Sequence, residues 1–555
     1  MVNWPGGFHE LFYRRTPDAV YFASRVALLT ELWGYVPEAD EQSVVELLTG
    51  GAVRSGATMF SGVRRVNPGS ICRIGPDGHA RAEHAYTLGA AERVAPDGDD
   101  VYLDLHRRTI AGFMENRSDV GVFLSGGIDS SFNAMCALDV APEKTRLLTI
   151  GFEGTEFDET SVARDVARAL GAESRLEVIP MGSADALDGL PQIIWAIEQP
   201  TTDYSIVPTS GVCLHCAAHT AAAMGGDGPD HLLGRKYGPA TWDALLAALP
   251  GSAATARWLT ASSTGMCRHA LWSRLRRKRA GRQLWLALAA GSDRGGRGLS
   301  NVYTSLLYGP LAPSAVGGLI SPALRQRTTP LRRISDLIEA PPLGPAGRLE
   351  TYSAADASTD SAAAGVLAKI GKASRMAGLD LFEPYLSRPT VEYFWRLSSR
   401  HKLRGSAFRR LANRIPSRHT KLILRRLLAR RVPQHVTDRS KQGFEPPLAA
   451  WLRQRLAGRT ARHLCGSLLA HTDWLNETFV DRVIAEHVAG DADHRYLLFV
   501  LASLDQWHRA FIVGRGERPS WSWSDALQEA DDRPRDVIAG RRSESQHEEA
   551  QCETG

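Results

Sequence analysis

The fold is decided by residues 119–135, whose sequence is DVGVFLSGGIDSSFNAM. Residues 120–124 are apolar and rich in β-branched side chains, which is typical of a buried strand. Ser125, Gly126 and Gly127 then interrupt this run, and residues 129–139 have the spacing of a helix. The stretch therefore predicts a strand, a tight glycine turn and a helix in direct succession.

The residues around this stretch repeat the same alternation of strands and helices. Helices are predicted over 102–116, 129–139 and 158–171, and strands over 120–124, 146–152 and 174–180. Strands that alternate with helices of this length favour a parallel sheet with right-handed crossovers. Residues 1–95 hold short strand-like pieces such as AVYFAS and GSICRI, and residues 240–515 are predicted to be mostly helical. We therefore expect an α/β fold, a doubly wound parallel sheet, with a mostly helical C-terminal part.

The bulk composition is that of an ordinary globular protein. Apolar residues make up 43% of the 555 residues, and charged residues make up 23%. No apolar run is long enough for a membrane span, and the start MVNWPGGFHE lacks the pattern of a signal peptide. Seven cysteines without an export signal fit a reducing compartment, so a cytoplasmic location is expected. The polar residues 516–555 are predicted to be a disordered tail.

The net charge is only +5, but it is unevenly distributed, since residues 268–283 and 396–431 are dense in arginine. They could bind nucleic acid. No nucleic-acid-binding signature accompanies them, so we interpret them as solvated helix faces, some of them near a polyphosphate substrate. The segment CLHCAAH, residues 213–219, offers Cys213, Cys216 and His219 on one helical face. It has no fourth ligand at a standard zinc spacing and is interpreted as a packed helix.

The turn after the first predicted strand has the chemistry of an anion site. Gly126 and Gly127 allow the backbone to approach a phosphate, and free N–H groups at the start of a helix attract an anion. Ser125 and Ser130 can donate hydroxyl hydrogen bonds. Asp129 would repel a phosphate unless it binds a Mg²⁺ that bridges to the phosphate oxygens. No lysine follows the glycines, so this is not a Walker loop.

The S-G-G-x-D-S loop resembles the pyrophosphate-binding loop of the ATP-pyrophosphatase superfamily. The resemblance extends to asparagine synthetases over roughly residues 10–510, in ordered blocks. These blocks include LLTIGFEGTEFDETSVARDVARALGA (147–172), AAMGGDGPDHLLGRKY (222–237), VLAKIGKASRMAGLDLFEPYLSRPTVEYF (366–394) and KLILRRLLARRVPQHVTDRSKQGFEPPLAAWL (421–452). It implies an adenine nucleotide α-hydrolase-like synthetase domain over 96–515, preceded over 1–95 by part of an N-terminal nucleophile hydrolase-like glutaminase domain.

This resemblance implies an ATP-dependent ligase that adenylates a carboxylate, releases pyrophosphate and passes the acyl group to an amine or ammonia. ATP and Mg²⁺ are the implied cofactors. By their positions in the motifs, Asp129 and Asp230 correspond to the Mg²⁺-binding carboxylates, and Lys441 to a lysine that reaches the pyrophosphate oxygens. The implied nucleotide-binding residues are Leu124, Ser125, Gly126, Gly127, Asp129, Ser130, Ile150, Gly225 and Gly226.

The acid–base group of the acceptor site is implied less directly. Asp227 stands where asparagine synthetases carry a glutamate and β-lactam synthetases a tyrosine, and Asp380 corresponds to a glutamate that pairs with that tyrosine. Two carboxylates that face one amine could act as base and ammonium-binding group. We therefore expect Asp227 and Asp380 to lie together, in a pocket wider than one shaped for ammonia.

The sequence departs from the family pattern at its start. Glutamine-hydrolysing members carry a cysteine directly after the initiator methionine, whereas Val2 follows Met1 here and the first cysteine is Cys72. The resemblance therefore predicts either a misassigned start or a remnant domain that does not hydrolyse glutamine by itself, and a homodimer or partner chain could complete it. Alternatives that stay open are a lasso-peptide or β-lactam-type cyclase, a tRNA-linked adenylating enzyme, and a non-catalytic remnant.

Overall fold

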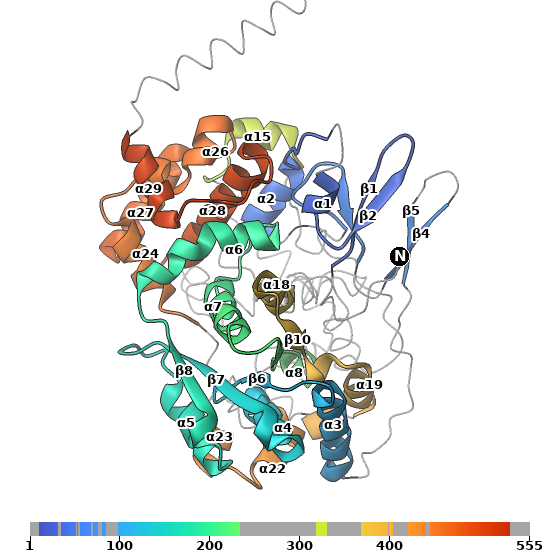
Figure 1. Cartoon of the computed structure of the whole chain (residues 1–555). Helices are drawn as coiled ribbons and strands as arrows, with labels where there is room; N and C mark the ends of the chain where they lie inside the picture. Colours follow the sequence, from blue (N-terminus) through green and yellow to red (C-terminus); the bar gives the residue numbers. More distant parts are fainter. Residues whose placement is uncertain are drawn as a thin grey trace, which may run out of the picture.

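The computed structural model describes residues 10–30, 35–51, 53, 56–67, 70–75, 80–84, 98–233, 318–329, 368–397, 399–402, 420–439 and 445–532. At its centre lies a parallel five-stranded sheet with helices on both faces (Figure 1). The strands are β6 (Val120–Phe123), β7 (Thr145–Gly151), β8 (Leu176–Pro180), β9 (Ala222–Met224) and β10 (Asp380–Phe382). The predicted α/β fold with a doubly wound parallel sheet is confirmed.

The strand order β10-β9-β6-β7-β8 places a reversal between β6 and β9. From β6 the chain moves outward in one direction to β7 and β8, and it then returns to β9 and β10 on the other side. Gly121 pairs with Ala223, and Val122 pairs with Met224, so the two strands end at the same edge of the sheet. Ligands of open parallel sheets bind at such a reversal, beyond the carboxyl ends of the strands.

Alternate residues of each strand enter different hydrophobic cores. Val120, Val122 and Leu124 belong to the core on one face, while Leu148 and Ile150 belong to the core on the other. The first face is covered by α3 (Asp99–Met114), α4 (Ile128–Val140), α5 (Thr160–Ala169), α19 (Arg388–Arg396), α22 (Leu422–Leu428) and α23 (Gln434–Asp438). The second is covered by α6 (Leu190–Ile197), α7 (Ile206–Ala217) and α18 (Ala368–Ala377).

Shorter elements and a C-terminal group of helices complete the described structure. The short elements are η1 (Pro142–Lys144), η2 (Glu173–Arg175), η3 (Ala184–Gly189), α8 (Pro229–Leu232), α15 (Pro322–Arg327), η6 (Pro384–Leu386) and α20 (Ser399–Lys402). The C-terminal group consists of α24 (Leu448–Leu456), α25 (Ala461–Leu464), α26 (Gly466–His471), α27 (Glu477–Ala489), α28 (Arg495–Trp507), the π-helical η8 (His508–Val513) and α29 (Trp523–Asp532). Within the described ranges, no helix combines the length and the apolar character needed to cross a bilayer.

The N-terminal region forms a small antiparallel structure that packs on the C-terminal helices. It contains β1 (Phe12–Arg15), β2 (Val20–Ala23), α1 (Ala27–Thr30), α2 (Glu41–Gly50), β3 (Val63–Arg65), β4 (Ser70–Ile74) and β5 (Ala80–His84). Phe60 meets Trp507 and Phe511 edge to face, with ring centroids 5.2 and 5.4 Å apart. The N-terminal region and the C-terminal helices therefore share one hydrophobic core. The division at residue 95 stays a prediction.

The prediction of a disordered tail from residue 516 is wrong for residues 516–532. Trp523 is buried at the start of α29, and the indole N–H of Trp521 donates to Gln506 Oε1 at 3.0 Å. The Trp521 carbonyl in turn accepts a hydrogen bond from Gln192. Two aromatic anchors therefore hold a segment whose average composition is polar. Residues 533–555 lie outside the described part.

Candidate functional site

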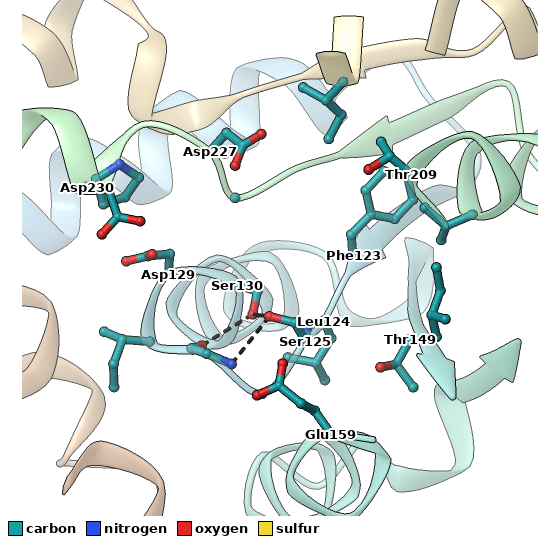
Figure 2. Close-up of a pocket in the computed structure, with 18 of the residues that line it drawn as sticks. Phe123, Leu124, Ser125, Asp129, Ser130, Thr149, Glu159, Thr209, Asp227 and Asp230 are labelled. Carbon is teal, nitrogen blue, oxygen red and sulfur yellow. Dashed lines mark hydrogen bonds between the residues drawn. The ribbon is translucent and has the colours of Figure 1, made fainter. Parts of the chain in front are cut away.

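A cavity of about 250 Å³ lies at the reversal between β6 and β9. Its walls come from the loop after β6, the ends of β6 and β7, helices α7 and α18, the loop after β9, and the segment that precedes α22 (Figure 2). The structure brings together here almost all the residues that the sequence singled out. The predicted residues that line it are Leu124, Ser125, Gly126, Gly127, Asp129, Ser130, Ile150, Gly226, Asp227 and Asp230.

The loop after β6 is a compact turn at the N-terminus of α4. Gly126 has φ +72°, and a Cβ at this position would lie 2.9 Å from Val162 Cγ1 on α5. Only glycine fits both the left-handed backbone and the close approach. The hydroxyls of Ser125 and Ser130 lie 3.1 Å apart, and the Ser125 N–H donates to Ser130 Oγ at 3.2 Å (Figure 2). These contacts fix the turn, and the first residues of α4 line the cavity. Free amides at the N-terminus of a helix suit an anion.

The glycines of the loop after β9 permit two further close approaches. A Cβ at Gly226 would lie 3.4 Å from the backbone of Ser130, so the two loops touch there. A Cβ at Gly225 would lie 1.8 Å from Glu383 Oε1, a position that the Glu383 carboxyl fills instead. Gly225 is buried beneath the cavity, and its predicted direct role in nucleotide binding stays a prediction.

Asp129 and Asp230 meet across the cavity with one ammonium group between them. Lys421 contacts Asp129 Oδ2, and its Nζ lies 2.9 Å from Asp230 Oδ1. Burial by itself would lower the pKa of Lys421, but the two carboxylates outweigh it and hold the pKa above its ordinary value. Lys421 therefore remains charged. Two carboxylates from separate elements that already share a cation have the oxygen donors that Mg²⁺ prefers.

Lys421 is a residue that the sequence analysis did not select. Its backbone is left-handed, with φ 55°, which is uncommon outside glycine and directs attention to function. Arg425 and Arg439 also line the cavity, and Arg439 forms an ion pair with Glu159 at 3.0 Å. The Arg425 side chain is held by the carbonyls of Thr420 and Thr437. Cationic side chains from three positions therefore line the cavity, which suits a polyphosphate.

The other end of the cavity is apolar. Ile150 and Phe152, at the end of β7, are buried, and Phe123, Phe157 and Val212 lie around them. The Leu124 N–H donates to the Leu148 carbonyl at 2.8 Å, which continues the ladder between β6 and β7 up to the glycine turn. An aromatic or heterocyclic group could pack at this end while its charged part reaches Gly126 and Lys421.

Asp227 lies next to a buried glutamate, Glu383. Its backbone N–H donates to Glu383 Oε2 at 2.8 Å. Burial, together with the charge of Asp227, raises the pKa of Glu383 well above its ordinary value and so favours the protonated form of Glu383. Lys369 Nζ donates to Ser205 Oγ at 2.8 Å and lies 3.5 Å from Asp203 Oδ2. Two carboxyl groups and a lysine whose side chain is 12% exposed therefore cluster at this wall.

The expected pairing of Asp227 with Asp380 is wrong. Asp380 pairs with Ala222 at the beginning of the parallel strands, whereas the cavity lies beyond their ends. Its side chain is exposed and forms an ion pair with Arg117. Glu383 follows the other end of this short strand, beside Asp227, and occupies the position expected for Asp380. Lys441 lies outside the described residues, so its role stays a prediction.

The chain is similar to a known protein family and to several curated proteins. The asparagine synthase family model matches residues 102–509. The asparagine synthetase [glutamine-hydrolyzing] 1 of Bacillus subtilis is 24% identical over 534 residues, which cover 92% of this chain and 75% of that protein. Putative asparagine synthetases [glutamine-hydrolyzing] of Mycobacterium bovis and Mycobacterium tuberculosis are each 27% identical over 534 residues, covering 92% of this chain and 74% of theirs.

Proposed function

Because the chain belongs to the asparagine synthase family of ATP-dependent amide-forming ligases, we propose that it adenylates a carboxylate and transfers the acyl group to an amine. The observation that carries this proposal is the meeting of Asp129, Asp230 and Lys421 opposite the glycine loop after β6. A site that combines phosphate-binding amides, paired carboxylates and cations suits a metal–nucleotide complex. The proposal concerns the reaction class, with aspartate as the first acyl substrate to test.

In this proposal the adenine packs against Ile150 and Phe152, and the phosphates lie along Gly126 and Gly127 toward Lys421. The apolar and cationic ends of the cavity support this orientation. Asp129 and Asp230 would hold Mg²⁺, which would supply neutralisation of phosphate charge. The residues of the chain itself bind and orient the nucleotide, and the cations Lys421, Arg425 and Arg439 offset charge that builds on the phosphate oxygens.

The reaction proceeds in two displacements. An oxygen of the substrate carboxylate attacks the α-phosphorus, the bond to the bridging oxygen of the β-phosphate breaks, and pyrophosphate leaves. The amine nitrogen then attacks the carbonyl carbon of the acyl-adenylate, AMP leaves with the bonding electrons, and the nitrogen gives up a proton. We assign that proton to Asp227, because Asp227 lines the cavity and its neighbour Glu383 lies buried behind it.

The test is ATP–pyrophosphate exchange by the full chain with Mg²⁺, with aspartate added or withheld. We expect exchange that depends on a carboxylate and is lost in Asp129→Asn. Asp139→Asn is the matched control, because Asp139 lies on the same helix but pairs with Arg107 and Arg431 outside the cavity. Ammonium and glutamine are then compared as nitrogen donors by the amide that forms.

The outcomes separate the alternatives. Exchange with aspartate supports an asparagine-forming enzyme, whereas exchange only with a larger acid, such as a peptide carboxylate, supports a cyclase of the lasso-peptide or β-lactam type. Binding of ATP without exchange for any acid, or no Mg²⁺-dependent binding of ATP, would contradict the proposal and favour a non-catalytic role. Equal loss of exchange in Asp129→Asn and Asp139→Asn would show a general folding defect and remove the support for the site.

A further inference from the structure

The segment CLHCAAH, residues 213–219, separates into two faces at the end of α7. Cys213 and Cys216 are fully buried and face the sheet, where a Cβ at Gly121 would lie 2.4 Å from Cys216 Sγ. Burial raises the pKa of the Cys216 thiol to about 12 and raises that of Cys213 as well. Because only a thiolate is a good metal ligand, these cysteines are packing residues.

The opposite face carries a different group of ligands. His215 Nε2 lies 2.6 Å from Glu177 Oε1, and the rings of His215 and His219 have centroids 5.2 Å apart. One ligand atom from each of the three side chains lies within 4.8 Å of the other two. Glu177 is 44% exposed and His215 33% exposed, so an ion can reach them from solvent.

The backbone explains why these three residues converge. His215 lies in the last turn of α7, and His219 lies four residues later in the turn that follows the helix, where its N–H donates to the Cys216 carbonyl at 3.0 Å. This turn brings the two imidazole rings side by side. Among the strands that the structure describes, β8 lies at the edge of the sheet and pairs only with β7. Glu177 stands opposite Leu148 in that pairing and shares its face, which is the face that α7 covers. The strand therefore presents a carboxylate to the histidine pair.

We propose that Glu177, His215 and His219 form a binding site for a divalent transition-metal ion of the zinc type. Two imidazoles and one carboxylate are a recurrent ligand set for Zn²⁺, with Zn–N and Zn–O distances of about 2.0–2.2 Å and a fourth position open to water. A metal would replace the hydrogen bond between His215 Nε2 and Glu177 Oε1, and the exposed side chain of His219 would turn toward them to complete the set. Mg²⁺ is excluded by its preference for oxygen ligands.

A metal at this site would cross-link the edge strand β8 to the end of α7. The same helix lines the cavity further toward its N-terminus, through Thr209 and Val212. The proposed ion would therefore hold the outer wall of the cavity in place, although its ligands do not line the cavity. This role does not depend on the ligase reaction proposed above.

The test uses the full chain freed of metal, titrated with Zn²⁺ by calorimetry and with Co²⁺ by visible absorption. We expect an equivalent of Zn²⁺ that the double variant His215→Ala/His219→Ala no longer binds, and that Glu177→Gln binds roughly tenfold more weakly or worse. His435→Ala is the matched control, because His435 also faces a carboxylate, Asp165, at 3.1 Å on the surface. It should bind Zn²⁺ like the parent chain, and Mg²⁺ should not compete.

Three results would overturn the proposal. They are no Zn²⁺ binding by the parent chain, equal binding by the parent and the double variant, and a Co²⁺ spectrum with thiolate charge-transfer bands. The last would assign the metal to cysteine. Melting temperatures in EDTA check the fold of each variant, and if the double variant is misfolded, His219→Ala alone and Glu177→Gln carry the test.

Discussion

Replacing Lys421 with methionine should destabilise the metal-free chain and make its stability depend strongly on Mg²⁺. The Lys421 side chain is 5% exposed, and its two partners Asp129 and Asp230 are 18% and 20% exposed. Removing one partner of a buried ion pair costs about 3–5 kcal/mol. Because both carboxylates keep some contact with solvent, we take the lower end, about 3 kcal/mol. For a chain of 555 residues with an unfolding entropy of about 2.1 cal/mol/K per residue, this corresponds to a fall of roughly 2–3 °C in melting temperature.

Mg²⁺ should reverse most of this loss in the Lys421→Met variant. At a free concentration about 100-fold above its dissociation constant, a ligand stabilises the folded state by about 2.7 kcal/mol. In the parent chain Mg²⁺ must displace Lys421 from the same carboxylates, so its melting temperature should rise less. Thermal denaturation with EDTA or with increasing Mg²⁺ measures both effects.

Lys372→Met provides the matched control. Lys372 is also buried, and its Nζ lies 3.2 Å from Glu10 Oε2, far along the chain from the carboxylate pair of the cavity. It should lose stability as Lys421→Met does, but Mg²⁺ should not restore it. The reasoning is refuted if Lys421→Met melts like the parent chain in EDTA, or if Mg²⁺ stabilises all three proteins equally.

Three further substitutions test other parts of the structure. Gly126→Ala should weaken ATP binding and lower the melting temperature, because φ +72° and Val162 leave no room for a Cβ; calorimetric titration with ATP would contradict this if affinity were unchanged. Glu383→Gln should gain stability relative to the parent as pH rises above 4.5. The pKa of Glu383 is raised in the folded state, so the parent loses stability as pH rises toward that folded pKa, and the glutamine variant does not. Urea denaturation of both proteins would refute this if the difference in their free energies of unfolding were the same at pH 4 and pH 8. Trp523→Ala should cost about 3–5 kcal/mol and release α29, since Trp523 is fully buried; protease resistance of residues 516–532 equal to that of the parent would contradict the docking.

The parts of the site that follow a strand directly could be predicted from the sequence. The apolar run, the glycine turn and the helix around Ser125 form a local pattern, and each residue's neighbours in sequence determine its place. Asp129 and Asp230 could be expected to meet because the ends of parallel strands share one edge of the sheet. Their meeting needed only the correct order of strands, and the structure has β6 beside β9.

Asp380 shows where this reasoning failed. Asp380 is the first residue of a three-residue strand and Glu383 directly follows its last, so the motif alone did not show which acid stands at the carboxyl end. The rule that functional residues follow the end of a strand would have favoured Glu383, which comes directly after the apolar pair Leu381 and Phe382. Matching a family position without placing the strand put the acid at the wrong edge of the sheet.

The described arginines near the end of the stretch 396–431 lie in two different environments. Arg426 and Arg430 pair with Asp99 and Asp100 at the start of α3, as expected of solvated helix faces. Arg425, next to them in sequence, is buried and faces the cavity. Helical spacing shows that neighbours point in different directions, but the sequence does not show which of them points to the cavity. That choice is made by the packing of α22 against α4.

The positions of the two loops also depend on partners that no local pattern could reveal. Asn133 Nδ2 donates to the Gly225 carbonyl at 2.6 Å, and His106 Nε2 lies 2.7 Å from Asn133 Oδ1, while Tyr102 contacts the other ring nitrogen of His106 at 3.2 Å. Burial lowers the pKa of His106 to about 4, so the chain of hydrogen bonds is neutral near pH 7. A neutral network satisfies these buried polar groups without placing a further charge behind the carboxylate pair. The network lies on α3 and α4, and its side chains do not line the cavity. They nevertheless hold the loop after β9 against the helix that begins at the loop after β6, because Asn133 of α4 donates to the Gly225 carbonyl.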